Sequence, residues 1–330
     1  MDITQDFRFT PDRLNVENRM PGVSAFMRIR NGAFSLEAAI RSHIGHFDEI
    51  VALYNRCTDE TPEILHRLAC EYGPKLRVFH YLPEVFPPGS DGHRTEPPDS
   101  PRSLVAYYNC ALSLTRFSHA TKLDDDHLAM DDALATLLSD VKRGRAARRN
   151  LACYSGLNLS RDRSGRLGIL AREPFSGSGD ISVFPVQPTT YFVHDPRFER
   201  FQHPGLRPTF HSFTYWHLKY LKPDMGFANY DLVLNPKSRY ARRQKRLLAG
   251  QAVVSPNDLD ALHPFATLYN RIATSAGPLL PARYGVLAAR NAAFHDSVVS
   301  RAQDDLWRSL DHSALFQRLM MPVSETEAVV

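Results

Sequence analysis

The chain has 330 residues, of which 43% are hydrophobic and 23% charged, so it can bury a sizeable core and is not a disordered protein. The formal net charge of +4 is too small to indicate nucleic-acid binding. No apolar run approaches the ~18 residues of a membrane-spanning helix, and the polar start has no secretory pattern. We therefore expect a cytoplasmic protein whose four widely spaced cysteines are small buried thiols: Cys57, Cys70, Cys110 and Cys153.

After a polar N-terminal arm over residues 1–21, the first half of the chain alternates strands and helices. Strands are expected at three short apolar runs: 23–29, 49–54 and 76–81. Amphipathic helices are expected between them, at about 36–47 and 61–72, with His43 packed on the buried face of the first. This alternation predicts an α/β fold, with a mostly parallel sheet flanked by helices.

A long loop over residues 83–101, rich in Pro, Gly, Asp and Ser, follows the third strand and has the composition of a functional lid or a disordered insertion. A helix is then expected at about 103–117, followed by a strand that ends in three aspartates, Asp124–Asp126, and His127. If this strand continues through the triplet, Asp124 and Asp126 lie on one side of the chain and His127 points away from Asp126.

Two carboxylates that lie close together repel, and a divalent cation such as Mg²⁺ or Mn²⁺ would relieve that repulsion. An acidic turn that caps the next helix, which begins near Asp131, would explain the same residues. In open parallel sheets, ligands bind beyond the carboxyl ends of the strands. Those ends carry polar side chains, which favours a metal and ligand site: Arg28, Arg30, Asn31, Asn55 and the aspartates.

From Leu151 onward the pattern changes to a hairpin at 151–159 and 167–170, a strand at 181–186 and an aromatic segment at 210–221. A basic cluster over Lys237–Arg246 and a mainly helical C-terminal region follow. We expect three parts: an arm (1–21), a domain with a donor half (22–150) and an acceptor half (151–235), and a helical C-terminal extension (236–330).

The first half resembles glycosyltransferases of the GT-A fold, particularly the family 2-like enzymes of bacterial surface polysaccharide synthesis. The resemblance covers roughly residues 22–145. Asn55–Leu65 looks like the segment after the family's second strand, Tyr108-Asn109 like its Arg-Asn helix position, and Asp124–Asp126 like its D-x-D metal motif. It implies an enzyme that moves a sugar from a nucleotide-sugar donor to a glycan or lipid-linked acceptor, with Mn²⁺ or Mg²⁺ as cofactor.

The resemblance also implies roles for individual residues. Asp126 would be the direct metal ligand, and Asp124 would contact the metal or the donor ribose. A later histidine would complete the metal site, with His217 and His211 as candidates. The donor would be bound by residues at the strand ends and in the helix before the triplet: Arg28, Arg30, Asn31, Tyr54, Asn55, Asn109, Asp124 and Asp125.

The chain departs from the family pattern at two places. Tyr54 stands where an aspartate usually contacts the base, and no carboxylate lies at Phe213–Tyr215, where an acidic pair is expected. The general base of an inverting transfer would then be Asp180 or Glu199. Tyr215 and Trp216 are candidates for stacking on the acceptor sugar, although core packing would explain them equally.

The basic cluster Lys237–Arg246 is either a solvated face or a surface that contacts anionic lipid at the inner face of the cell membrane. Two other functions fit the same sheet: a sugar-phosphate nucleotidyltransferase and a non-catalytic sugar-binding protein. The first would usually need a glycine-rich phosphate loop, and Arg28–Gly32 contains a single glycine.

Overall fold

The computed structural model describes residues 2–144, 150–177, 181–195, 198–227, 230, 232–233, 236–250, 252–254, 272 and 282–294. Its α-helices are α1 (Leu36–His43), α2 (Thr61–Tyr72), α3 (Asp91–Thr95), α4 (Leu104–Ser113), α5 (Asp131–Lys142), α6 (Arg239–Leu248) and α8 (Ala282–Phe294). The strands of the first half are β1 (Asp2–Ile3), β2 (Met20–Ile29), β3 (Glu49–Tyr54), β4 (Leu76–Tyr81), β5 (Phe117–Lys122) and β6 (His127–Ala129). Those of the second half are β7 (Asn150–Arg161), β8 (Leu167–Leu170), β9 (Phe175–Ser176), β10 (Ser182–Pro185), β11 (Tyr191–Asp195), β12 (Phe198–Gln202), β13 (Arg207–His217) and β14 (Val253–Val254).

One sheet runs through both halves of the chain in the order β1-β4-β3-β2-β5-β10-β7-β13-β6. The strands from β1 to β5 are parallel to their neighbours. β10 is antiparallel to β5 and β7, whereas β7 and β13 are parallel. The expected α/β class is therefore confirmed, and the parallel part has the continuously buried strands that such sheets require, as in β3.

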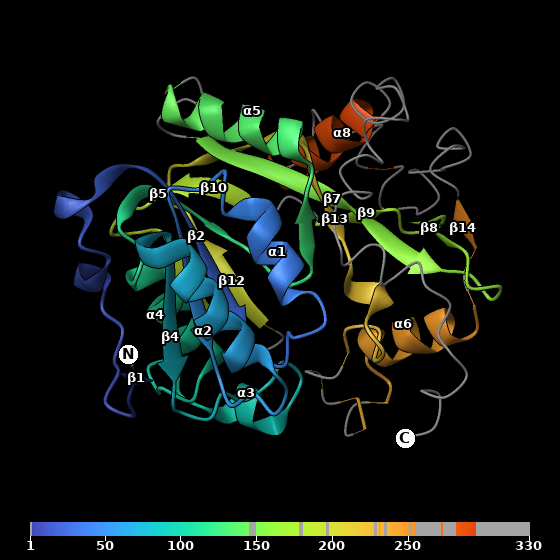
Figure 1. Ribbon diagram of the computed structural model, residues 1–330, viewed down its shortest axis with the longest axis horizontal. Helices are drawn as coiled ribbons and strands as arrows, with labels where there is room; N and C mark the ends of the chain where they lie inside the picture. The colour runs from blue at the N-terminus through green and yellow to red at the C-terminus, as the bar shows by residue number, and fades with distance from the viewer. Residues whose placement is uncertain are drawn as a thin grey trace.

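Helices cover both faces of this sheet (Figure 1). One core joins the apolar stripes of α1, α2 and α5, represented by Ile40, Leu65 and Leu137. A second core on the other face joins α4 to β11 and to the N-terminal arm, where Leu14 is fully buried. The arm was expected to be irregular, but β1 pairs with β4 and two short 3-10 turns follow it.

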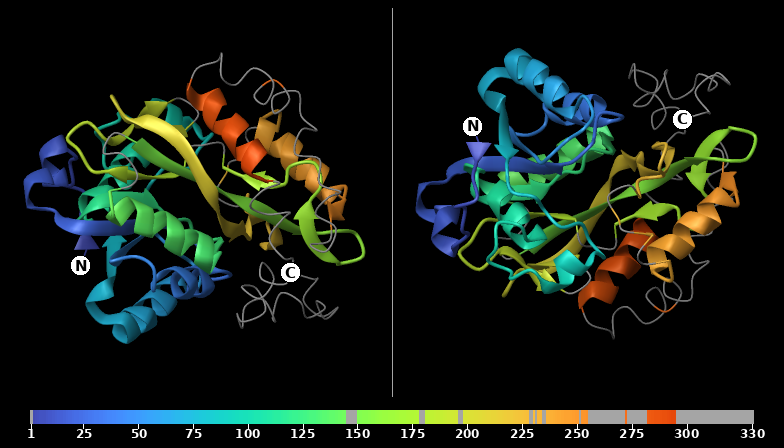
Figure 2. Two further views of the ribbon diagram at one scale, coloured as in Figure 1. Left: turned by 90° about the horizontal axis from the view of Figure 1, so that it is seen from above. Right: turned by 90° about the horizontal axis from the view of Figure 1, so that it is seen from below.

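The two long strands β7 and β13 extend from the first half of the chain toward α6 and α8 (Figure 2). β8 pairs with β7 as the expected hairpin. α8 packs against β13, with Phe294 fully buried beside Phe175 and Phe213. Most of the expected extension 236–330 lies outside the described residues.

The α4 helix fixes the strand ends on which the site is built. The Ser103 hydroxyl caps it by accepting a hydrogen bond from the Ala106 amide at 3.0 Å. The buried Tyr107 hydroxyl donates to the Leu53 carbonyl at 2.7 Å and accepts from the Ile29 amide at 3.1 Å. One side chain thus ties α4 to the last residues of β2 and β3. The helix ends at Ser113, earlier than expected, because Phe117 already belongs to β5.

Other expectations were met in part. His43 is buried as expected, with Nδ1 2.8 Å from the Ala39 carbonyl oxygen. All four cysteines are free, and Cys110 and Cys153 are buried, but Cys70 is exposed because it lies on the outer face of α2. Among the described helices, none is long and apolar enough to cross a membrane.

Candidate active site

A pocket of about 370 Å³ lies where the ends of β2, β3 and β5 meet α4 and the segment after β13. Its polar lining includes cations and carboxylates from distant parts of the sequence: Arg28, Arg30, Lys122, Asp124, Asp125, Asp126, Lys219 and Lys222. Part of the long proline-rich loop, Val85–Pro88, forms another wall. The polar strand ends therefore converge on one pocket, as expected of a sheet with this connectivity.

All three aspartates line this pocket, which differs from the expected alternation along a strand. β5 ends at Lys122, and Leu123–Asp126 form a turn before β6 begins at His127. A turn does not send successive side chains to opposite faces, so Asp125 faces the pocket together with its neighbours.

Asp124 lies between two cations. Its carboxylate is 3.0 Å from Lys122 Nζ and 3.3 Å from an Arg28 guanidinium nitrogen. The guanidinium carbon of Arg28 is in turn 3.2 Å from the centre of the Tyr108 ring, a cation–π contact. Burial opposes the ionisation of Asp124, but Lys122 and Arg28 outweigh this effect and hold its pKa below the ordinary value.

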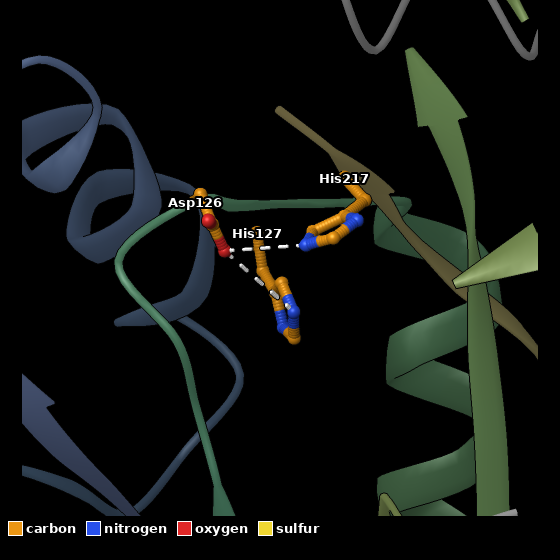
Figure 3. Close-up of side chains that lie close together, drawn as sticks. All are labelled: Asp126, His127 and His217. Atoms are coloured by element: carbon orange, nitrogen blue, oxygen red, sulfur yellow. Dashed lines mark ion pairs between the residues drawn. The ribbon is translucent and has the colours of Figure 1, made fainter. Parts of the chain in front are cut away.

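Asp126, His127 and His217 form a group that could hold a metal ion (Figure 3). Asp126 Oδ1 is 3.5 Å from His217 Nε2 and 4.0 Å from His127 Nε2. His127 was expected to point away from Asp126, and that expectation was wrong because Asp126 lies in the turn before the strand. The His127 ring is buried and stacks on Tyr215 with ring centres 3.7 Å apart.

The protonation of His217 follows from its neighbour Asn158. The Asn158 amide nitrogen donates to the Glu173 and Phe175 carbonyls at 2.8 and 2.9 Å. Its side-chain oxygen must then accept from His217 Nδ1 at 2.6 Å. This arrangement directs the lone pair of a neutral His217 at Nε2 toward Asp126, which is the tautomer of a histidine metal ligand.

Burial sets the charge state of the remaining groups. It lowers the pKa of His127 to about 3, so this imidazole is neutral near pH 7. It raises the pKa of Asp125 to about 6 despite the opposing charge of Lys222. It also opposes ionisation of Asp126, but Lys222 and His217 outweigh burial and hold the Asp126 pKa well below its ordinary value.

Two lysines of the pocket were not predicted from the sequence. Lys222 Nζ is 2.9 Å from Asp125 and 3.3 Å from Asp126. Lys219 Nζ lies 5.2 Å from the Phe227 ring centre and 5.0 Å from that of Tyr230, and burial lowers its pKa. Both lie just after the aromatic segment, and the sequence separation of 97 residues between Lys222 and Asp125 hid their proximity.

The predicted donor residues divide into two groups. Arg28, Arg30, Asn55, Asp124 and Asp125 line the pocket. Three others lie outside its lining because their side chains hold the fold together: Asn31 bonds to Thr58, Tyr54 stacks on His80, and Asn109 bonds to the backbone of Phe192. Even Asn55, although it lines the pocket, donates its amide hydrogens to the carbonyls of Tyr81 and Pro83.

The predicted acceptor residues are buried. Trp216 is fully buried in the core between β13 and its neighbours, and Tyr215 is buried beneath His127. Neither presents a ring to the pocket, so core packing explains both. His211 is on β13 as well, but it pairs with Asp140 of α5 at 3.2 Å.

Of the two candidate bases, Asp180 lies outside the described residues, and Glu199 lies on β12. Glu199 lines a small hollow of about 80 Å³ with Lys122 and three aromatic rings: Phe184, Phe192 and Phe201. Lys122 also lines the main pocket, so the two hollows adjoin. Burial raises the pKa of Tyr108, and the neighbouring Glu199 carboxylate adds to this rise.

No family model and no curated protein sequence matches this chain. Three solved structures match it with these values. A mannosyltransferase from Pyrobaculum calidifontis with GDP-Man and Mn²⁺ is 16% identical at a TM-score of 0.38, covering 93% of this chain and 89% of that one. S. aureus TarS 1-349 with UDP is 11% identical at 0.35, covering 91% and 81%. Glucosyl-3-phosphoglycerate synthase from Mycobacterium tuberculosis, with Mn²⁺, UDP and glucosyl-3-phosphoglycerate, is 14% identical at 0.27, covering 48% and 51%.

Gly156 tests the support beneath the histidines. A Cβ at this position in β7 would overlap the Tyr215 ring and lie 2.5 Å from its carbonyl oxygen. We predict that Gly156→Ala lowers the free energy of unfolding by about 1–3 kcal/mol, because the ring that carries His127 must shift. Urea denaturation followed by circular dichroism would measure this. Gly45→Ala is the matched control, since its Cβ would meet nothing within 4 Å; equal stability of the two variants would contradict the prediction.

Proposed function

We propose that this protein is a metal-dependent glycosyltransferase of the GT-A type, which transfers a sugar from a nucleoside-diphosphate sugar to a hydroxyl acceptor. The proposal depends on one observation: His217 directs its Nε2 lone pair at Asp126 inside a pocket lined by five cations. Without a cation between them, the lone pair and the carboxylate would repel. Carboxylate oxygen together with neutral imidazole suits Mn²⁺, and Mg²⁺ through the oxygens.

In this proposal Asp126 and His217 hold the ion, and His127 or Asp124 adds a further ligand. A bound divalent ion would stabilise the negative charge that develops on the leaving diphosphate. Arg28, Arg30 and Lys219 contribute positive charge around the phosphates from three sides of the pocket. Residues 22–150 thus form the donor half, and residues 151–235 carry the acceptor side.

Glu199 is the general base of an inverting transfer in this proposal. Its hollow has aromatic walls that could pack against the apolar face of a sugar, and it adjoins the donor pocket at Lys122. Asp180 remains the other candidate. The acceptor would be a glycan or lipid-linked chain in polysaccharide synthesis.

The metal assignment predicts that Asp126→Asn abolishes Mn²⁺-dependent transfer. The amide removes the negative charge, so we expect Mn²⁺ affinity and the transfer rate each to fall by at least about 100-fold, as for loss of a metal ligand. UDP- and GDP-sugars would first be screened by thermal shift with Mn²⁺, and turnover of the stabilising donor would then be measured.

His211→Gln is the control for this experiment, because His211 lies on the same strand as His217 but pairs with Asp140. Full activity of Asp126→Asn would disprove the metal site. Release of pyrophosphate would instead indicate a nucleotidyltransferase, and donor binding without turnover on any acceptor would indicate a sugar-binding protein.

The base assignment predicts that Glu199→Gln lowers kcat by about 10²–10⁴-fold, the usual contribution of general base catalysis. Donor affinity should stay within about threefold, because Glu199 lies outside the lining of the donor pocket. Steady-state kinetics and donor titration would separate the two quantities. Glu63→Gln, on the exposed face of α2, is the control, and an unchanged kcat in Glu199→Gln would return the role to Asp180.

The basic cluster Lys237–Arg246 favours contact with an anionic membrane surface, which suits a lipid-linked acceptor. α6 anchors itself through the buried Leu247 and exposes Arg242, Lys245 and Leu248, while Arg243 and Arg246 pair with Glu173. We predict that the protein sediments with phosphatidylglycerol vesicles and much less with phosphatidylcholine vesicles. Reversing Arg242 and Lys245 to Glu should reduce binding at least about tenfold, at about 1 kcal/mol per basic residue. Equal binding to both vesicle types would contradict this.

A further inference from the structure

Lys222 places an ammonium group among the aspartates. Its Nζ lies 2.9 Å from Asp125 Oδ2 and 3.3 Å from Asp126 Oδ2, and only 13% of its side chain is exposed. Asp126 therefore uses its two oxygens differently. Oδ2 faces the lysine, while Oδ1 faces the two histidines that could bind a metal.

The charges around the triplet already balance. Three carboxylates, Asp124–Asp126, face three cations at salt-bridge distance: Arg28, Lys122 and Lys222. A divalent ion that entered alone would add two positive charges to a buried and neutral cluster, where like charges repel strongly. A nucleoside diphosphate that entered with the ion would compensate for this charge.

The backbone that carries Lys222 is fixed to the triplet. The Leu218 amide donates to the Asp126 carbonyl at 2.8 Å, and the Met225 amide donates to the Lys222 carbonyl at 2.8 Å. Met225 and Gly226 have left-handed φ values of 53° and 69°, which close a tight turn against Lys219. The backbone position is thus set, whereas the four-carbon stem lets the ammonium move between nearby partners.

We propose that Lys222 is a tethered cation that occupies the Asp125–Asp126 carboxylates in the absence of donor and competes there with the divalent ion. When metal and nucleotide bind together, the ammonium moves to the diphosphate. Metal binding is thereby made dependent on nucleotide, so the site does not load metal without donor. This inference rests on the metal site of the proposed function.

The test removes the charge and keeps most of the stem, as Lys222→Met. Mn²⁺ binding would be followed by electron paramagnetic resonance without nucleotide, and then with UDP and, separately, GDP. Without nucleotide, we expect Lys222→Met to bind Mn²⁺ at least about tenfold more tightly than the unmodified protein, because a competing charge beside the ligands is gone. With Mn²⁺ present, its affinity for the preferred nucleotide should be at least about tenfold weaker.

Lys222→Arg keeps the charge and should restore weak Mn²⁺ binding without nucleotide, while Lys245→Met, on exposed α6, should match the unmodified protein. If Lys222→Met is unfolded by circular dichroism, Lys222→Gln provides the same test with a hydrogen-bond donor retained. Equal or weaker Mn²⁺ binding by the neutral variants would overturn the inference alone. Absence of Mn²⁺ binding in every variant, with and without nucleotide, would overturn the metal site as well.

Discussion

The repulsion between three neighbouring carboxylates is the constraint on which this structure depends. Asp124–Asp126 are gathered in one turn at the end of β5, largely shielded from water. Ionised carboxylates are costly to bury unless cations lie beside them. Arg28 from β2, Lys122 from β5 and Lys222 from the segment after β13 provide those cations. The triplet thus holds three distant parts of the chain in one place.

The second half of the chain completes the site through the pairing of β13 with β6 and β7. His217 pairs in register with His127 on one side and Asn158 on the other. One strand position therefore sets both the imidazole and the residue that orients it. Gly156 and Tyr215 form the packed layer beneath, where the absence of a Cβ lets the ring lie flat under His127.

Individual residues show how far sequence patterns could predict this site. Asp126 and Arg28 were predicted because the polar ends of parallel strands must meet at one edge of the sheet, and the structure brings them into one pocket. The resemblance also pointed to His217. Asn109 and Trp216 were predicted to bind ligand but are used in packing, since an amide or a ring serves both purposes and only its neighbours distinguish them. Lys222 was missed because no local pattern links it to a turn 97 residues earlier.

The sequence alone determined the α/β alternation, because short apolar runs and amphipathic spacing are local properties that the backbone must satisfy within a few residues. It also determined that acidic and basic side chains follow the strands. Only the tertiary structure decided that all three aspartates face one pocket, that His127 joins His217, and that an ammonium lies between Asp125 and Asp126. These facts depend on the direction of turns and on contacts between residues far apart in the chain, which are set when the two halves share one sheet.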